Sequence, residues 1–369
     1  MKTAIILSLT LAIGLFAQSP LQQAFDLARH SRYAEARAIL KGVPEPATVS
    51  QRIVYHRLLA AIASGLHEPA TAINETKAAL ALSPSDPQLL LALALAELQA
   101  GQVEDALSHA QASPESAPRE ALIGDIQEKR GHYLEAAKAY EAAAALAPDQ
   151  ERYRVALALE LIEHQSLQRA VDLLESSSKT FPRSAKIRTL LGIAQYAQGY
   201  TEDAVISLED AIALAPKPQA PYAALSKIVL QSSAAPTRRT IDCLCAWSRL
   251  ACSALDLRVA RANGDTKLQT KALAALKLAP PDSVIGRCEL ARAYEWSNQL
   301  SKARTELEAC VRLDPSPQNH YRLGLLYQKL GLNSLAQDQM KQREQLLSNM
   351  SEQTALGLGA LQELDAPTR

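Results

Sequence analysis

The sequence has few aromatic residues and no excess of charge of either sign. Phe, Trp and Tyr make up 4% of the 369 residues although 48% are hydrophobic, and Ala and Leu fill most of the apolar positions. This composition favours helices that pack closely through small side chains. Lys plus Arg and Asp plus Glu both total 39, so the chain lacks the positive excess that binding to a phosphate backbone requires. We therefore expect an all-α protein that does not bind nucleic acid.

The sequence also lacks the local motifs of common active sites. No two of its seven His residues are closer than eleven positions, which excludes the H-E-x-x-H metal pair. There is no G-x-S-x-G elbow, no G-x-x-x-x-G-K phosphate loop and no dinucleotide-binding fingerprint. Strand-like alternation is absent as well. We expect a non-catalytic protein without a cofactor or a bound metal.

A long hydrophobic run occurs at the N-terminus. Residues 1–17 place Lys2 before an apolar stretch from Ala4 to Phe16, which is the pattern of a secretory signal peptide. The stretch is shorter than the roughly 20 residues that cross a bilayer. We expect cleavage near Ala17 and an exported, periplasmic or secreted protein with no stable membrane insertion after cleavage. The large Leu15 leaves the exact cleavage site open.

A repeat of 34 residues organises the chain. Pro148, Pro182 and Pro216 are 34 positions apart and mark the ends of frames that begin at residues 117, 151 and 185. Small residues recur at two positions of these frames: Gly124, Ala158 and Gly192 at position 8, and Ala136, Ala170 and Ala204 at position 20. Position 15 holds Gly131, Gln165 and Gly199. Small side chains at positions 8 and 20 allow two helices to approach closely, and a residue such as Gly suits the left-handed end of a helix.

This pattern resembles the tetratricopeptide repeat, a helix–turn–helix unit of 34 residues. The resemblance implies an all-α, right-handed superhelical solenoid of about eight to ten hairpins. We assign the solenoid to residues 18–350, with degenerate repeats in 219–283, and expect helices near 219–231, 237–248, 250–263 and 266–279. A solenoid needs a polar cap at its end, so residues 351–369 are predicted to form a capping helix and a frayed tail.

The resemblance also implies which residues face a partner. In this family the concave surface is formed by positions 2, 5, 9, 12 and 13 of each first helix. The residues at these positions here are Leu91, Leu95, Leu98, Asp125, Glu128, Lys129, Arg152, Leu159, Glu163, Ile193, Tyr196, Arg292, Glu295, Trp296, Tyr321, Leu325, Gln328 and Lys329. For each residue, packing or plain solvation is the alternative role. The family's carboxylate clamp is not reproduced, because Val155 and Leu159 stand where Lys and Asn would be.

Five Cys in an exported chain suggest disulfides, with an odd thiol left over. Cys288 and Cys310 lie ten and twelve residues from a turn near Asn298, level on two antiparallel helices, so a disulfide between them is predicted, and two separate buried thiols are the alternative. For Cys243, Cys245 and Cys252 a thiolate metal site, a redox pair, a disulfide and buried free thiols all stay open. A bond between Cys245 and Cys252 needs a helix break near residues 248–250.

Taken together, these patterns indicate a binding scaffold. We expect a protein–protein interaction scaffold of the cell envelope that binds an extended peptide or a partner helix on its concave surface. The alternative is an accessory subunit of an envelope enzyme or transport system that recognises glycan or lipid precursors near Trp296 and Tyr321.

Overall fold

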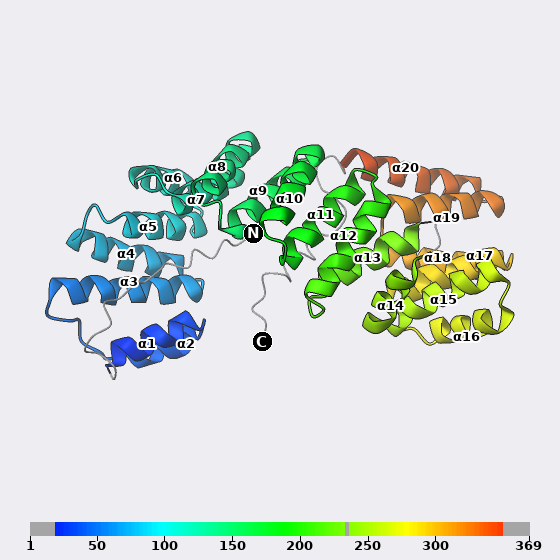
Figure 1. The fold of residues 1–369 in the computed structure, drawn as a ribbon, viewed down its shortest axis with the longest axis horizontal. Helices are drawn as coiled ribbons and strands as arrows, with labels where there is room; N and C mark the ends of the chain where they lie inside the picture. Colours follow the sequence, from blue (N-terminus) through cyan, green and yellow to red (C-terminus); the bar gives the residue numbers. More distant parts are fainter. Residues whose placement is uncertain (1–18, 233–235, 350–369) are drawn as a thin grey trace. The chain divides into compact units, whose positions relative to one another are not determined.

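The computed structural model describes residues 19–232 and 236–349, and these residues form twenty α-helices and no strand (Figure 1). The predicted signal peptide and the predicted C-terminal cap lie outside the described residues. Within those residues, no helix is both long enough and apolar enough to span a membrane. The chain divides into two compact units, which meet in sequence between Leu157 and Ala158.

Unit 1 consists of four helical hairpins and the start of a ninth helix. Its helices are α1 (Pro20–Arg29), α2 (Tyr33–Leu40), α3 (Val49–Gly65), α4 (Pro69–Leu82), α5 (Pro87–Gln99), α6 (Val103–Ala112), α7 (Ala117–Lys129), α8 (Tyr133–Leu146) and the first half of α9 (Glu151–Glu163).

Unit 2 continues the same alternation. It contains the rest of α9 and then α10 (Leu167–Thr180), α11 (Ala185–Ala197), α12 (Thr201–Leu214), α13 (Ala220–Gln231), α14 (Arg238–Trp247), α15 (Arg249–Asn263), α16 (Thr266–Lys277), α17 (Val284–Trp296), α18 (Leu300–Leu313), α19 (Pro317–Lys329) and α20 (Asn333–Asn349).

Turns at position 15 of the repeat have the left-handed backbone that the sequence predicted. Gly131, Gln165 and Gly199 have φ values of 74°, 58° and 91°. At Gly131 the helix end is closed by two bonds, from the Gly131 N–H to the Glu128 carbonyl and from the His132 N–H to the Gln127 carbonyl, both 2.9 Å long. These two hydrogen bonds satisfy carbonyls in the last turn of α7, and the left-handed residue turns the chain into α8.

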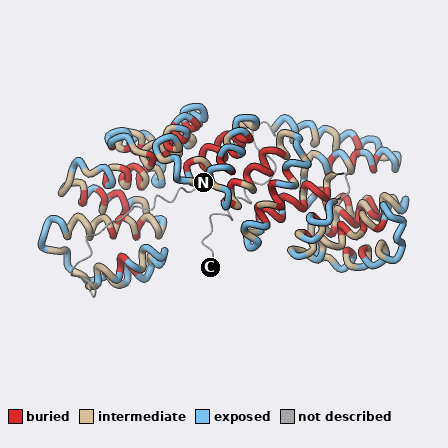
Figure 2. The backbone as a smooth tube through the Cα atoms, in the orientation of Figure 1, coloured by how far each residue is buried: buried red, intermediate tan, exposed pale blue. Residues whose placement is uncertain are grey.

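Small residues set the spacing between the two helices of a hairpin. Ala136 and Ala204 are fully buried, as predicted. A Cβ atom on Gly124 would lie 2.6 Å from the Tyr140 ring, and one on Gly192 would lie 2.7 Å from Leu208. In each unit buried residues lie where neighbouring helices face each other, both within a hairpin and between successive hairpins (Figure 2). Bulk at either position would force these helices apart.

The four helices expected in the degenerate stretch are present within two residues of their predicted limits, but their packing differs from that of a regular repeat. Helix α14 also packs against α12, where the buried Glu209 accepts a hydrogen bond from the Thr240 hydroxyl at 2.5 Å. Beside it, Arg239 pairs with Asp210 at 2.8 Å. Polar contacts with α12 thus hold α14 in a stretch where the repeat pattern of small residues is lost.

Candidate interaction surface

The first helices of the hairpins carry the residues that the sequence proposed for partner binding, and we call their outward sides the first-helix face of each unit. In unit 1 this face includes Leu95 and Leu98 of α5, which are partly buried. Leu91 was predicted to belong to it, but this residue is buried in a core with Ala94 and Leu122. Because Leu91 belongs to a core formed with residues of α6 and α7, the prediction is corrected and Leu91 is removed from the surface.

Two acidic residues of α7 are held in place by the second helix of their hairpin. The Tyr140 hydroxyl lies 2.6 Å from a carboxylate oxygen of Asp125 and 3.2 Å from one of Glu128. Lys129 on the same helix is exposed. The unit 1 face therefore combines partly buried leucines on α5 with oriented charges on α7.

Helix α9 contributes less than expected. The Arg152 guanidinium lies over the Tyr153 ring, 4.7 Å from its centroid, and donates to the Tyr153 hydroxyl at 2.8 Å. Glu163, near the other end of the helix, is half-buried. Leu159 and, on α11, Ile193 are buried, so these two expected surface residues are core residues instead.

In unit 2 the C-terminal end of α13 is a meeting point for side chains from three other first helices. Arg258 of α15 donates to the carbonyls of Val229, Leu230 and Ser232, with lengths of 3.3 Å to Val229 and 2.9 Å to Ser232. Arg292 of α17 donates to the Leu230 carbonyl at 3.2 Å. Helix ends leave carbonyls unpaired and carry partial negative charge, so guanidinium groups stabilise them.

The third contact at this helix end comes from α11. The Tyr196 hydroxyl donates to the Gln231 side chain at 3.0 Å, and burial raises the pKa of Tyr196. Tyr196 and Arg292 were both predicted to face a partner, and the structure brings them to the same helix end. The Tyr196 hydroxyl and one amino group of Arg292 bind the end of α13 there.

An ion-pair network joins α15, α17 and α19. Glu289, only 2% exposed, lies 3.2 Å from Arg258 and 3.3 Å from Arg292. Glu295 lies 3.2 Å from Arg322. Burial lowers the pKa of Arg258 and of Arg322, and repulsion from Arg292 lowers both further. The network therefore holds cations close together in a poorly hydrated place.

Two aromatic rings of this face each have a guanidinium over one side. Arg261 lies 4.2 Å from the centroid of the Trp296 ring, and Arg343 lies 5.1 Å from that of Tyr321. Tyr321 is 42% exposed and Leu325, one turn further along α19, is 37% exposed. Gln328 and Lys329 continue the exposed row. These four residues follow the spacing i, i+4, i+7 and i+8, so they lie on one side of α19. Of the first helices described in unit 2, α19 has the largest share of exposed residues.

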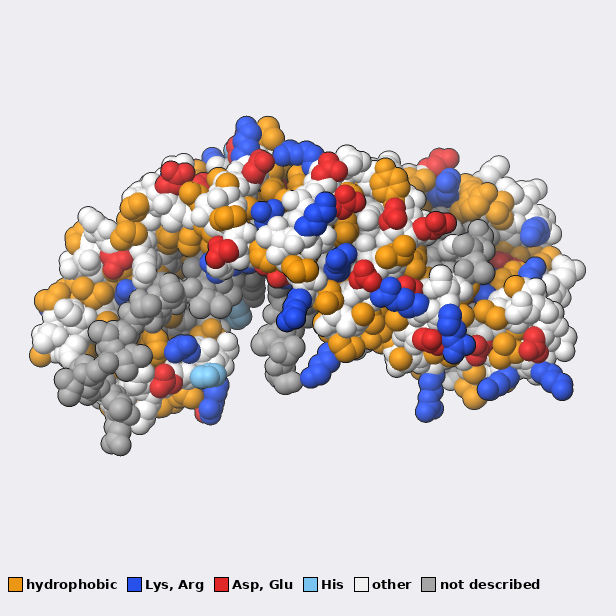
Figure 3. Space-filling model, viewed as in Figure 1, with side chains coloured by type: hydrophobic (Ala, Val, Ile, Leu, Met, Phe, Trp, Pro, Cys, Tyr) orange, Lys and Arg blue, Asp and Glu red, His pale blue; other side chains and the backbone are white. Residues whose placement is uncertain are grey.

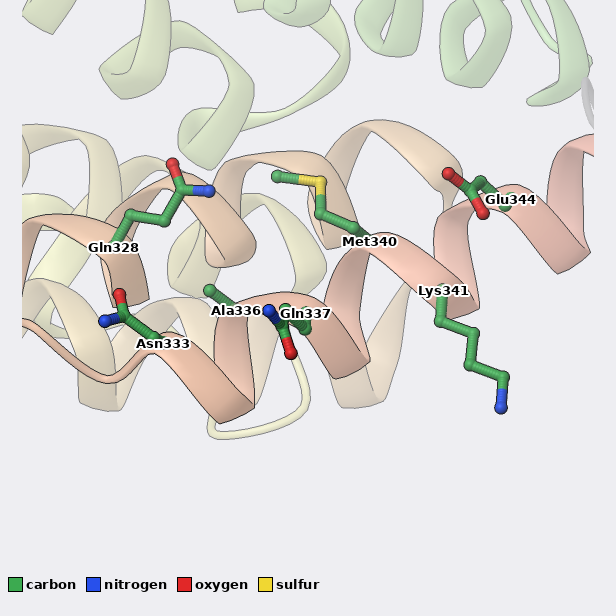
Figure 4. Close-up of a pocket in the computed structure, with 7 residues that line it drawn as sticks. All are labelled: Gln328, Asn333, Ala336, Gln337, Met340, Lys341 and Glu344. Carbon is green, nitrogen blue, oxygen red and sulfur yellow. The ribbon is translucent and has the colours of Figure 1, made fainter.

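A hollow of about 400 Å³ lies between α19 and α20 (Figure 4). Amide groups, an Ala, a Met and two opposite charges line it, from Gln328, Asn333, Ala336, Gln337, Met340, Lys341 and Glu344. This set has no nucleophile beside a base. Among the residues that the structure describes, no three His, Cys, Asp or Glu side chains are grouped so that they could hold a metal ion.

Disulfides join Cys288 to Cys310 and Cys245 to Cys252, with Cα atoms 5.0 and 4.3 Å apart, while Cys243 is free. The second bond crosses the break between α14 and α15 at Ser248. Burial, followed by repulsion from Glu209, raises the pKa of the Cys243 thiol. Of the options left open by the sequence, the structure has a disulfide and one half-buried thiol.

Sequence profiles described as tetratricopeptide repeat match residues 58–121, 121–150 and 155–221. The chain is a tetratricopeptide-repeat protein. Repeats of this family form protein–protein interaction scaffolds, and this general role is the one that the family supports here. No curated protein matches the sequence.

Comparison with solved structures finds several that align with part or most of this chain. The C-terminal part of a repeat protein from Cytophaga hutchinsonii is 14% identical, with a TM-score of 0.44, over 80% of this chain and 95% of that one. MamA from Desulfovibrio magneticus is 17% identical, with a TM-score of 0.39, over 46% of this chain and 97% of that one. A Thermus thermophilus repeat protein is 18% identical, with a TM-score of 0.38, over 48% and 99%.

Sequence reasoning missed three members of the ion-pair network of this tetratricopeptide-repeat protein. Glu289 and Arg322 both occupy position 6 of their repeats, outside the family's concave positions, and Arg258 lies in the degenerate stretch. A signal was present, because position 6 is apolar in the regular repeats, as at Leu122 and Leu190. A charge at a position that is elsewhere buried indicates a polar contact with another helix.

Proposed function

We propose that the chain is an exported, non-catalytic scaffold of the cell envelope that binds an extended peptide or a partner helix on its first-helix faces. The observation that carries this proposal is the exposed row on α19, where Tyr321 and Leu325 lie beside Gln328 and Lys329. Apolar groups at helical spacing with polar neighbours suit a partner that inserts a few side chains and pairs its own polar groups at the edge. The sequence of residues 1–17 supports export.

The alternative, an accessory subunit that recognises glycan or lipid precursors, would use the same aromatic rings. A sugar stacks on an aromatic ring through the ring's open face. Trp296 and Tyr321 each have a guanidinium over one face, so only the other face of each ring is left for a sugar. A guanidinium beside each ring is more compatible with a peptide, which brings both apolar side chains and charged groups.

Site-specific photocrosslinking in the native host tests the proposal. A photoreactive phenylalanine analogue would replace Leu325 in unit 2 or Leu95 in unit 1, and the matched control would replace Leu134, which is 59% exposed on the second helix α8. We expect adducts with a protein partner at Leu325 or Leu95 and none at Leu134. Adducts with glycan or lipid at Leu325 would favour the alternative, and identical adducts at all three positions would contradict a first-helix binding face.

A further inference from the structure

The arginine residues of the unit 2 first-helix face outnumber the carboxylates that pair with them. Arg258, Arg292 and Arg322 share Glu289 and Glu295, so the network has one more positive than negative charge. Among the described residues, no carboxylate lies within ion-pair distance of Arg261, whose guanidinium contacts the Trp296 ring. These four arginines thus exceed their two carboxylate partners by two charges, although the whole chain has a net charge of zero.

These four arginines have different tasks. Arg258 is used by the molecule itself, because its guanidinium donates to three carbonyls at the end of α13 and to Glu289. Arg292 shares Glu289 with Arg258 and gives one bond to the Leu230 carbonyl. Arg322 has Glu295 as its ion-pair partner, and Arg261 is exposed. The groups with capacity for another acceptor are therefore Arg261, Arg292 and Arg322.

We propose that Arg261, Arg292 and Arg322 form a binding site for carboxylate side chains of an acidic partner peptide, with Trp296 packing against an apolar residue of the same peptide. This inference rests on the proposed function and specifies the chemistry of its partner. Helix α15 packs against α17, and Arg322 of α19 pairs with Glu295 of α17, so an extended segment that crosses these helices meets the three arginines in turn.

Charge complementarity decides the class of partner. Guanidinium groups donate paired hydrogen bonds that match a carboxylate, and an ion pair strengthens where water is partly excluded. An added carboxylate also offsets the mutual repulsion of Arg292 and Arg322. A basic segment would meet the unbalanced charges with repulsion. Acidic and basic side chains are interspersed on the surface of unit 2 that Figure 3 shows, which is not an extended cationic surface.

Binding of peptide libraries to the full chain tests the inference. One library alternates Glu with apolar residues, and a matched library has Gln at every Glu position, with labelled peptides followed by fluorescence anisotropy. We expect the Glu library to bind about tenfold more tightly, and added NaCl to reduce that difference. Arg261→Gln and Arg322→Gln should each weaken binding of the Glu library by about tenfold. Arg322→Lys should weaken this binding less than Arg322→Gln does, because the positive charge remains.

The control substitution is Arg238→Gln, because Arg238 is 86% exposed and pairs only with Asp242 on its own helix. It should leave the affinity unchanged, and unaltered thermal unfolding of each variant would show that the fold is intact. Equal affinity for the Glu and Gln libraries would refute the recognition of acidic peptides. It would not contradict the proposed binding of a partner on the first-helix face, which the crosslinks at Leu325 test separately. Absence of binding to both libraries would also refute the inference. Binding of inorganic phosphate or a polynucleotide in place of the Glu library would show a phosphate site and overturn the proposal.

Discussion

Cys288 of α17 and Cys310 of α18 are joined by a disulfide that ties the two helices of one hairpin together, with Cα atoms 5.0 Å apart. The bond closes a loop of 22 residues, so it restricts the unfolded chain. Replacing both residues by Ala should lower the free energy of unfolding by about 3 kcal/mol in non-reducing buffer. Denaturant midpoints measure the loss.

The disulfide itself can be mapped chemically. Digestion of the unreduced protein should yield a single cross-linked species that contains both Cys288 and Cys310. Alkylation of both thiols in unfolded, unreduced protein would contradict the bond. The same map should recover Cys245 with Cys252 and leave Cys243 as the alkylated residue.

Overpacking of the hairpins tests the small-residue positions. Ala136→Leu and Ala204→Leu should each destabilise the protein by about 1–3 kcal/mol, because both residues are fully buried between paired helices. Ala145 on α8 is exposed and provides the control, for which Leu should change stability little. Equal denaturant midpoints for all three variants would show that the small residues do not set the helix spacing.

Removing Arg258 should be among the costliest single changes in unit 2. Arg258→Met would leave Glu289 buried with only part of its compensation and free three carbonyls of α13, at a cost of about 3–5 kcal/mol. The double variant Arg258→Met with Glu289→Leu should recover part of this loss, because no buried carboxylate then remains and Arg292, which loses its ion pair, is partly exposed and keeps its bond to the Leu230 carbonyl. A double variant less stable than Arg258→Met would contradict this account.

Tyr327 should titrate late. Burial, helped by its hydrogen bond to Glu308 at 2.8 Å, raises the pKa of Tyr327 to about 12. Because the folded pKa lies above the unfolded value, this residue contributes stability below pH of about 10 that is lost as the pH rises toward 12. Absorbance titration of phenolate should show a late-titrating group that disappears in Tyr327→Phe. An unchanged late phase in that variant would assign it to another tyrosine.

Export predicts a processed N-terminus. Protein recovered from the native host should lack about 17 residues by intact-mass measurement, and substitution of Lys2 together with Asp in the apolar stretch should block export. Full-length protein held in membranes would contradict cleavage.

The regular part of the fold could be predicted from the sequence because a small set of repeat positions determines the turns and the helix spacing. Gly131, Gln165 and Gly199 have the expected left-handed turns, and Ala136 is buried as its position requires. These contacts are local and repeat every 34 residues, so spacing alone reveals them. The prediction of the Cys288 partner used the same local geometry.

The candidate surface was harder to predict. Exposure at a concave position depends on the side chains that the neighbouring helices present, and Leu91 is buried in a core that includes Ala106 of α6 and Leu122 of α7. The contacts of Arg258 with α13 join residues 26 to 29 positions apart in a stretch where the repeat frame is lost. No periodic pattern marks such a contact, although the charge at position 6 in Glu289 was a visible sign.

The hydrogen bond from Arg292 to the Leu230 carbonyl has a consequence for how unit 2 unfolds. It joins α17 to α13 across 62 residues and passes over the α15 and α16 hairpin. In a linear array whose units contact only their neighbours, segments can melt one at a time from an end. A bond that skips one unit makes the opening of α13 and that of α17 energetically dependent on each other. The degenerate stretch 219–283 is therefore where the unfolding of successive hairpins becomes more cooperative. The departure from the regular repeat there couples hairpins that a regular array would leave independent.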